Sequence, residues 1–362
     1  MGPKPDAKNP AVSVSPSSPS GPFGPGPGAG GPERTRDLLA KSLGRRPEIV
    51  SLAGRSTMGT GGPAVLLPVH TDGELKRTLG ALAELGLTFG IIGGASNVLF
   101  PDAGTVVPIL SLEGDFKTIE VVGNAVKAGG GAVMGALVKA ALSADLRGLE
   151  IAVGLPGTVG GAVGGNAGTK EEGLAHLIGE LELVRPNGET VVLPKADLRP
   201  VYRSLNLPAD LAGSVIARVS LELAPKGAGL EGFEGAEAFD YEATLQSRKA
   251  KQPSGRSLGS VFKNPPGDFA GRLIDGRGLK GRKIGGAQIS EKHANFILNV
   301  GGARSADVLE LALLARDEVL AHTGIRLWPE IKIWDAWARD VGLPEPGQAR
   351  PEGPSNRPEG AK

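Results

Sequence analysis

Glycine residues crowd the stretch 148–168, where they could hold a bulky anionic ligand. Glycine has no Cβ and tolerates positive φ, so its backbone can approach a ligand closely. Successive amides turned inward form a concavity that suits phosphate. Flexible linkers are mostly Gly and Ser, whereas here Leu155, Val159, Ala162 and Val163 are interleaved with the glycines. We therefore expect an ordered, partly buried loop after the apolar run 149–153, with a flexible surface loop as the alternative.

A second glycine turn, Gly-Gly-Ala-Ser-Asn at residues 93–97, follows a short apolar strand expected at 89–92. A turn of this kind at the end of a buried strand is a second place where phosphate could bind. The alternative is a plain tight turn, which the same residues also favour. Neither turn identifies a ligand by itself.

The composition sets limits on the chemistry. The chain has 362 residues, 40% of them hydrophobic and 22% charged, which is enough to bury a core. Lys and Arg number 40 against 39 Asp and Glu, so there is no overall basic field to attract nucleic acid. The absence of cysteine excludes disulfides, thiolate metal sites and cysteine nucleophiles. No metal site is predicted. With neither a signal peptide nor a membrane-length apolar run, we expect a cytoplasmic protein without membrane contact.

The hydrophobic pattern predicts a scaffold of mixed α+β type for the two turns. Thr71 should cap a helix with Leu75, Leu79 and Leu82 on one face and Gly86 as its stop. The triplet Pro186-Asn187-Gly188 favours a hairpin with a two-residue turn. Helices are expected at 33–43, 72–85, 134–144, 243–251, 269–274 and 306–322, the last capped by Ser305, and strands at 65–69, 89–92, 106–110, 119–122, 125–129, 181–185, 190–193, 215–223, 296–300 and 327–334.

Composition also divides the chain. Segments 1–32 and 342–362 are rich in Pro and Gly and are expected to be disordered tails. A Gly- and Glu-rich stretch at 225–238 predicts a domain boundary. We therefore expect a first region at 33–224, with subdomains at about 50–97 and 98–224, and a C-terminal domain at 239–336.

Several motifs occur in an order that identifies a family. They are Gly-Gly-Ala-Ser-Asn-Val-Leu (93–99), Gly-Leu-Pro-Gly-Thr-Val-Gly-Gly-Ala (154–162), Asn-Ala-Gly (166–168), Tyr202-Arg203, Gly-Ser-Val-Phe-Lys-Asn-Pro (259–265), Gly-Gly-Ala-Gln-Ile-Ser (285–290), His-Ala-Asn-Phe (293–296) and Leu-Trp-Pro-Glu (327–330). Over roughly residues 50 to 335 the chain resembles the UDP-N-acetylenolpyruvoylglucosamine reductases, also called UDP-N-acetylmuramate dehydrogenases, of bacterial peptidoglycan synthesis. It resembles their shorter subtype, because few residues separate Arg203 from Ser260.

The resemblance implies a fold and a cofactor. The fold would be an FAD-binding domain of the vanillyl-alcohol-oxidase (PCMH) type followed by a C-terminal α/β substrate-binding domain. NADPH would reduce a non-covalently bound FAD, which would then reduce the enolpyruvyl group of UDP-N-acetyl-3-(1-carboxyvinyl)glucosamine. The implied cofactor-binding residues are Gly93, Gly94, Ala95, Ser96, Asn97, Gly154, Pro156, Gly157, Thr158, Gly160, Gly161, Ala162, Asn166, Ala167 and Gly168.

The resemblance also implies three catalytic residues. Arg203 matches the family's catalytic arginine, whose planar fork suits the substrate carboxylate. Ser260 matches the proton donor, and Glu330 matches a glutamate that orients or protonates near that carboxylate. On residue type alone each would be an ordinary surface or turn residue. The implied substrate-binding residues are Tyr202, Lys263, Asn264 and Gln288.

Some positions depart from the family pattern, and two other functions stay open. Ala95 stands where many members have Gly, and Ser204-Leu205 replaces the usual order after the arginine. One alternative is another FAD oxidoreductase of the same fold, although tethered flavin is disfavoured because no histidine lies in either glycine turn. The other is a non-catalytic flavin- or nucleotide-sugar-binding protein. The expected partners are small molecules only, and we expect a monomer.

Overall fold

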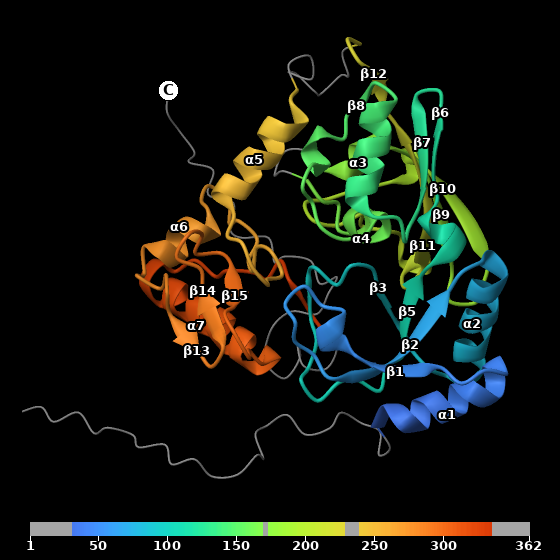
Figure 1. Cartoon of the computed structure of the whole chain (residues 1–362), viewed down its shortest axis with the longest axis horizontal. Helices are drawn as coiled ribbons and strands as arrows, with labels where there is room; N and C mark the ends of the chain where they lie inside the picture. Colours follow the sequence, from blue (N-terminus) through green and yellow to red (C-terminus); the bar gives the residue numbers. More distant parts are fainter. Residues whose placement is uncertain (1–30, 169–172, 229–238, 335–362) are drawn as a thin grey trace, which may run out of the picture.

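The structure is a computed structural model that describes residues 31–168, 173–228 and 239–334. Figure 1 shows three groups of elements: the first strands and helices at the lower right, a second sheet above them, and the C-terminal part at the left. The C-terminal tail and residues 229–238 of the expected domain boundary lie outside the described residues, as does the N-terminal tail up to residue 30. The described residues contain both helices and β-sheets, which confirms the predicted α+β class.

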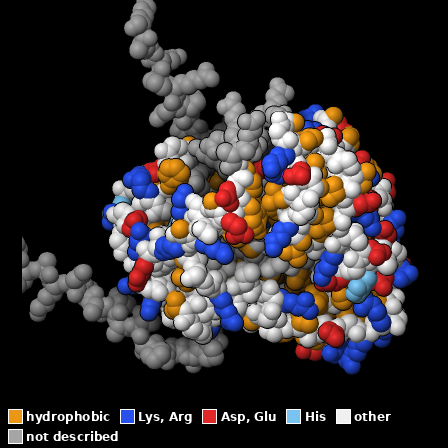
Figure 2. All heavy atoms as spheres, turned by 45° about the horizontal axis from the view of Figure 1, so that its top comes forward, with side chains coloured by type: hydrophobic (Ala, Val, Ile, Leu, Met, Phe, Trp, Pro, Cys, Tyr) orange, Lys and Arg blue, Asp and Glu red, His pale blue; other side chains and the backbone are white. Residues whose placement is uncertain are grey.

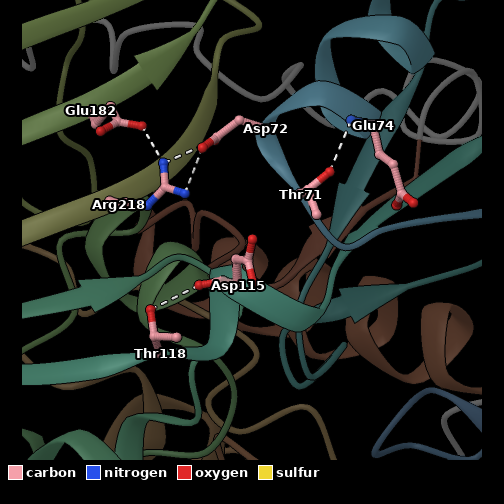
Figure 3. Close-up of polar contacts among 7 residues, drawn as sticks. All are labelled: Thr71, Asp72, Glu74, Asp115, Thr118, Glu182 and Arg218. Carbon is pink, nitrogen blue, oxygen red and sulfur yellow. Dashed lines mark hydrogen bonds and ion pairs between the residues drawn. The ribbon is translucent and has the colours of Figure 1, made fainter.

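The first sheet is built around strand β2 (Pro63–Val69), where Val65, Leu67 and Val69 are fully buried. It is parallel to β5 (Ile109–Leu112), which in turn pairs in parallel with β3 (Gly90–Ile92), while β1 (Glu48–Ser51) is the antiparallel edge. Helices α1 (Gly31–Leu43) and α2 (Asp72–Glu84) pack on β2. As predicted, Thr71 caps α2 by accepting a hydrogen bond from Glu74 N at 3.2 Å (Figure 3).

The second sheet is antiparallel, in the order β10-β9-β11-β7-β6. Its central strand β11 alternates buried and half-buried residues, as expected of a sheet covered on one face. Helices α3 and α4 pack against the sheet, and a two-stranded ribbon of β8 and β12 lies beside it. The bounds are β6 Ile119–Val122, β7 Ala125–Gly129, α3 Met134–Ser143, β8 Leu146–Arg147, α4 Val159–Gly164, β9 Ile178–Val184, β10 Thr190–Pro194, β11 Val215–Glu222 and β12 Ala224–Pro225.

The hairpin between β9 and β10 has a longer turn than the two residues predicted. Arg185 N donates to Glu189 O at 2.8 Å and Gly188 N donates to Arg185 O at 2.8 Å, which leaves three residues between the last paired positions. Only Gly188, with φ +84°, is left-handed. A two-residue primed turn would also need positive φ at Asn187. Because Pro186 has a fixed negative φ and suits the second position of an ordinary turn, the three-residue form results.

Arg218 on β11 joins the second sheet to the start of helix α2, which packs on the first sheet (Figure 3). Its guanidinium donates to both carboxylate oxygens of Asp72 at 2.9 Å and to Glu182 at 2.5 Å. It also lies over the ring of Phe116, 5.2 Å from the centroid. One hydrophobic core also contains residues from both sheets, among them Leu67 from β2 and Val215 from β11. The two sheets are therefore packed together rather than loosely linked.

In the C-terminal part, a small sheet with the strand order β13-β14-β15 packs against the long helix α7. The final strand β16 leaves this part and pairs in parallel with β4, the strand directly after the turn 93–97. The predicted strand 327–334 is therefore mostly wrong: only β16 is a strand, and the residues before it form a single antiparallel bridge, Pro329 with Phe262. The bounds are β4 Val98–Leu99, α5 Tyr241–Lys251, α6 Ala270–Asp275, β13 Lys283–Ile284, β14 Ala287–Ile289, β15 Ile297–Asn299, α7 Ser305–Thr323 and β16 Lys332–Ile333.

The prediction that Ser305 caps helix α7 is wrong. Ser305 is the first helical residue, and Arg304 is the N-cap. The free amides at the helix start instead donate to a distant side chain: Ser305 N to Asp102 Oδ1 at 2.8 Å and Ala306 N to Asp102 Oδ2 at 3.0 Å. Asp102 belongs to the first part of the chain, so this cap also holds the C-terminal part against it.

Two further boundaries differ from expectation. Strand β5 begins at Ile109, not at residue 106, because Val107 donates its N–H to Thr105 Oγ1 and Pro108 has no N–H. The glycine stretch expected as a loop contains the short helix α4. On the face shown in Figure 2, acidic and basic side chains are interspersed, as the near-zero net charge predicts.

Candidate active site

The two glycine turns predicted from sequence lie directly against each other. A Cβ added to Gly93 would lie 2.0 Å from Thr158 Oγ1, and one added to Gly94 would lie 2.8 Å from the Cα of Gly157. Carbon atoms normally approach no closer than about 3.5 Å, so only glycine fits at these two positions. Gly157 is itself left-handed, with φ +98°. The turns therefore form one site, not two.

A third glycine turn, residues 129–131 between β7 and α3, supports the second and was not predicted as part of the site. Gly160 N donates to Gly130 O and Val159 N donates to Ala132 O, both at 2.8 Å. A Cβ on Gly130 would lie 2.1 Å from Ile216 O. The signal was present in the sequence as three consecutive glycines between a strand and a helix.

The outer side of this cradle is open. At Gly161 an added Cβ would meet only Thr158 Oγ1, at an ordinary 3.5 Å. Val133, which forms a bridge with Thr158, is 58% exposed although it lies beside a core of buried aliphatic residues. Open glycines beside exposed apolar side chains suit a ligand that has both phosphates and a flat ring, so these residues fit an FAD-like cofactor.

The backbone conformation of Ala95 shows why many family members have glycine at this position. Its φ is +45° and it is buried. Left-handed backbone favours glycine, which is what many family members have there. The turn keeps its conformation in this chain with a methyl group in place of hydrogen.

Arg203 is at the tip of a tight turn. Val201 and Ser204 exchange backbone hydrogen bonds of 2.9 and 3.1 Å, with Tyr202 and Arg203 between them. Arg203 has φ +63°, a left-handed conformation that is uncommon for a long side chain. Backbone strain of this kind persists where surrounding contacts fix it, often at functional sites.

The guanidinium of Arg203 reaches two groups. Its Nη1 donates to Gly168 O at 2.8 Å, and its Nε lies 2.8 Å from Glu330 Oε1. The Nε–H finds no acceptor at hydrogen-bonding geometry in the described part of the chain, so the contact with Glu330 is an ion pair rather than a linear hydrogen bond. The guanidinium also lies 5.2 Å from the ring centroid of Tyr202.

Glu330 comes from the C-terminal part and is mostly buried, with 19% of its side chain exposed. Burial raises the pKa of its carboxyl group, and the positive charges of Arg203 and Lys263 oppose that rise. Its backbone is tied to the first glycine turn, since Asn97 Nδ2 donates to Glu330 O at 3.1 Å. The fold thus brings Arg203 and Glu330, which are 127 residues apart in the chain, within ion-pair distance.

The segment 260–264 runs beside Glu330. Val261 O accepts from Glu330 N at 2.8 Å, and Lys263 N donates to Trp328 O at 2.8 Å. Ser260 is therefore one residue from the position paired with Glu330. Among the described residues, no hydrogen-bond partner of Ser260 Oγ is found, which leaves its hydroxyl available to a ligand.

The other predicted substrate-binding residues have partners of their own. Burial raises the pKa of the Tyr202 hydroxyl, which accepts a hydrogen bond from the Asn264 backbone. Asn264 Oδ1 accepts from Ala270 N at 3.0 Å and so caps helix α6. Gln288 Nε2 donates to Gly281 O at 3.2 Å. Tyr202 thus lies in the Arg203 cluster, while the side chains of Asn264 and Gln288 also hold neighbouring loops.

Asn166, predicted to bind the cofactor, uses its amide within the protein. Its Oδ1 accepts from Ala175 N at 3.0 Å, and its Nδ2 donates to Val201 O at 3.1 Å. Its own φ is +40°. These bonds leave the predicted cofactor contact to the backbone of Asn166 rather than to its side chain.

Comparisons with known proteins give the same result from both halves of the chain. Residues 63–194 match the family described as FAD binding domain, and residues 250–334 match the C-terminal domain of UDP-N-acetylenolpyruvoylglucosamine reductase. The enzyme of that name from Anaeromyxobacter dehalogenans is 39% identical over 84% of this chain and 91% of its own length. The one from Thermus thermophilus is 38% identical over 78% of this chain and its full length. The crystal structure of the Thermus caldophilus enzyme superposes with a TM-score of 0.67 at 38% identity, over 80% of this chain and 99% of that one.

Two features are absent from the described residues. No helix there is long and apolar enough to cross a membrane. No group of three His, Cys, Asp or Glu side chains there is arranged to hold a metal ion.

Proposed function

The chain belongs to the UDP-N-acetylenolpyruvoylglucosamine reductase family, and we propose that Arg203, Ser260 and Glu330 carry the substrate half of its reaction. The enzyme reduces the enolpyruvyl group of UDP-N-acetyl-3-(1-carboxyvinyl)glucosamine to give UDP-N-acetylmuramate for peptidoglycan, with FAD as cofactor and NADPH as co-substrate. When bound, FAD supplies hydride transfer, from NADPH to the β-carbon of the enol ether. The observation that carries the residue assignment is the Arg203–Glu330 pair next to the glycine cradle.

Arg203 would stabilise the charge that develops on the substrate. Hydride addition to the β-carbon builds negative charge at the α-carbon and its carboxylate. A fixed cation aimed at that charge lowers the barrier, and it does so most effectively where water is largely excluded. Glu330 orients the guanidinium through their ion pair.

Ser260 would deliver the proton that completes the reaction at the α-carbon. A serine hydroxyl is a poor acid, so it needs a nearby positive charge to stabilise the alkoxide that remains. Lys263, whose charge acts on Glu330, lies on the same segment and can supply it. The free Oγ of Ser260 supports this role, since no competing acceptor among the described residues holds the hydroxyl.

The glycine cradle would hold the cofactor. The proposed contacts are those of turns 93–97 and 154–168, chiefly through backbone amides, with Thr158 and Ser96 as side chains between them. The proposed substrate contacts are Tyr202, Lys263, Asn264 and Gln288. We propose a division into an FAD-binding region at 33–224 and a substrate domain at 239–336. A cytoplasmic monomer without nucleic-acid or membrane contact completes the proposal.

The experiment is the visible spectrum of the purified protein and of its Arg203→Ala variant. Both proteins should show flavin bands that bleach with NADPH. In the wild type the bands should return at once when the enolpyruvyl substrate is added without oxygen, and in Arg203→Ala they should return slowly. Equal rates of return would refute the proposed role of Arg203. Rapid reoxidation by oxygen alone would favour an oxidase of the same fold.

A further inference from the structure

Asn166 is hydrogen-bonded to the turn that carries Arg203. Both ends of its amide are hydrogen-bonded, Oδ1 to Ala175 N at 3.0 Å and Nδ2 to Val201 O at 3.1 Å. Val201 O is the same carbonyl that closes the Arg203 turn, because it also accepts from Ser204 N at 3.1 Å. Asn166 therefore bonds the base of the turn whose tip is Arg203.

The conformation of that turn needs outside support. Arg203 is left-handed, a strained conformation that persists only where the surrounding structure holds it. The turn is short and its first residue, Val201, is 51% exposed, so apolar packing contributes little there. The Asn166 amide is the side-chain bond that connects the turn backbone to the cofactor loop.

Two residues further along, the same loop holds the other end of the arginine. Gly168 O accepts from Arg203 Nη1 at 2.8 Å. The segment 166–168 thus fixes the turn backbone through one residue and the guanidinium through another. Space around the amide is also restricted, since a Cβ on Gly173 would lie 2.1 Å from Asn166 Oδ1. A side chain packed this closely has one orientation, which is what a positioning role requires.

We propose that Asn166 is a positioning residue that holds Arg203 in its catalytic geometry through Val201. The inference rests on the proposed role of Arg203 in the substrate half of the reaction. It assigns the Asn side chain of the Asn-Ala-Gly motif to the arginine and not to the cofactor.

The test compares two variants of Asn166. Asn166→Asp keeps the acceptor for Ala175 N and the tolerance of left-handed backbone, but it replaces the donor to Val201 by an oxygen. Asn166→Ala removes both bonds. The matched controls are Asn206→Asp and Asn206→Ala, because Asn206 is also left-handed, with φ +50°, and its exposed side chain makes no hydrogen bond in the described part of the chain.

Both Asn166 variants should keep bound FAD and should be reduced by NADPH at the wild-type rate. Their reoxidation by the enolpyruvyl substrate should slow by about 10–10²-fold, the loss expected when a catalytic group is misplaced by roughly 1 Å. The Asn206 controls should reoxidise normally. In an Arg203→Ala background the same Asn166 changes should have almost no further effect, because residues that act through one another are not additive.

Three results would overturn the proposal. One is an equal fold-loss from Asn166→Ala in the wild-type and Arg203→Ala backgrounds. Another is loss of FAD as the main effect of both variants, which would make Asn166 a cofactor ligand. The third is a wild-type rate of reoxidation in Asn166→Asp. A wild-type rate in Arg203→Ala alone would instead refute the proposed function of Arg203, so the two failures can be told apart.

Discussion

Replacing Ser260 by alanine should separate the two halves of the reaction. Reduction by NADPH requires no acid in the substrate half of the site, whereas completing the reduction of the enolpyruvyl group requires a proton at the α-carbon. Positioned proton transfer typically contributes about 10²–10⁴-fold. At 1.36 kcal/mol for each factor of ten, that range corresponds to about 3–5 kcal/mol of transition-state stabilisation.

The structure indicates that this change costs almost nothing in folding. Ser260 Oγ has no hydrogen-bond partner among the described residues, so alanine leaves no buried group unpaired. A substitution of this kind usually changes the free energy of unfolding by less than about 0.5 kcal/mol. For a chain of this size the melting temperature should then change by less than about 2 °C. A large loss of activity would therefore report on chemistry, not on unfolding.

The assay is stopped-flow flavin absorbance, with reduction by NADPH and reoxidation by the enolpyruvyl substrate measured separately. Ser260→Ala should bleach normally and reoxidise about 10²–10⁴-fold more slowly, with kcat lowered and little change in KM. Ser257→Ala is the control. Its backbone oxygen accepts from Thr57 Oγ1 at 2.6 Å, and this bond survives the substitution. Near-normal reoxidation of Ser260→Ala, or a defect confined to reduction, would refute the assignment.

Three other changes test the cradle, the domain contact and the buried carboxylate. Gly161→Val should fold but bind less FAD, since its side chain would enter the open side of the cradle, whereas Gly80→Val on helix α2, equally open, should keep FAD; flavin content per protein decides. Asp102→Ala should lower the free energy of unfolding by about 0.5–2 kcal/mol through loss of the α7 cap, and an unchanged thermal melt would contradict this. Burial raises the pKa of Glu330, so the wild type loses stability as pH rises above about 4 and the carboxylate ionises in the fold. The melting temperature of Glu330→Gln, minus that of the wild type, should therefore increase from pH 4 to pH 7. A decrease in this difference would mean that the charges of Arg203 and Lys263 outweigh burial in setting the pKa of Glu330.

Local signals in the sequence were enough to predict the two glycine turns, but not that they form one cradle. Consecutive glycines after a short apolar strand indicate a turn whose backbone lies close to another group. In the structure, part of that group is the second glycine turn: Gly93 and Gly94 lie against Thr158 and Gly157. The cap of α2 by Thr71 was also predictable, because donor and acceptor are three residues apart. Signals of this kind depend only on neighbouring residues, so they can be read without knowledge of the fold.

The contacts that position the site could not be predicted in this way. Asp102 caps a helix that starts 203 residues later, and no pattern near Ser305 indicates it. Asn166 donates to the backbone carbonyl of Val201. Because every residue has such a carbonyl, the sequence does not indicate which one is the partner. The left-handed conformation of Arg203 could not be predicted either, because a glycine is the usual sign of such a conformation and this position has an arginine. The roles of Arg203, Ser260 and Glu330 came from the family resemblance alone.

Each glycine turn holds one member of the Arg203–Glu330 pair. The turn 93–97 holds Glu330, because Asn97 donates through Nδ2 to Glu330 O and accepts from Lys332 N at 2.9 Å. The loop 154–168 holds Arg203 through its Gly168 carbonyl. Since the two turns touch at Gly94 and Gly157, their packing also fixes how far apart the two charged groups lie. The absence of a side chain at Gly94 therefore matters for the Arg203–Glu330 pair, proposed to be catalytic, as well as for the proposed cofactor cradle: a Cβ there would push the two turns, and with them the two charged groups, apart.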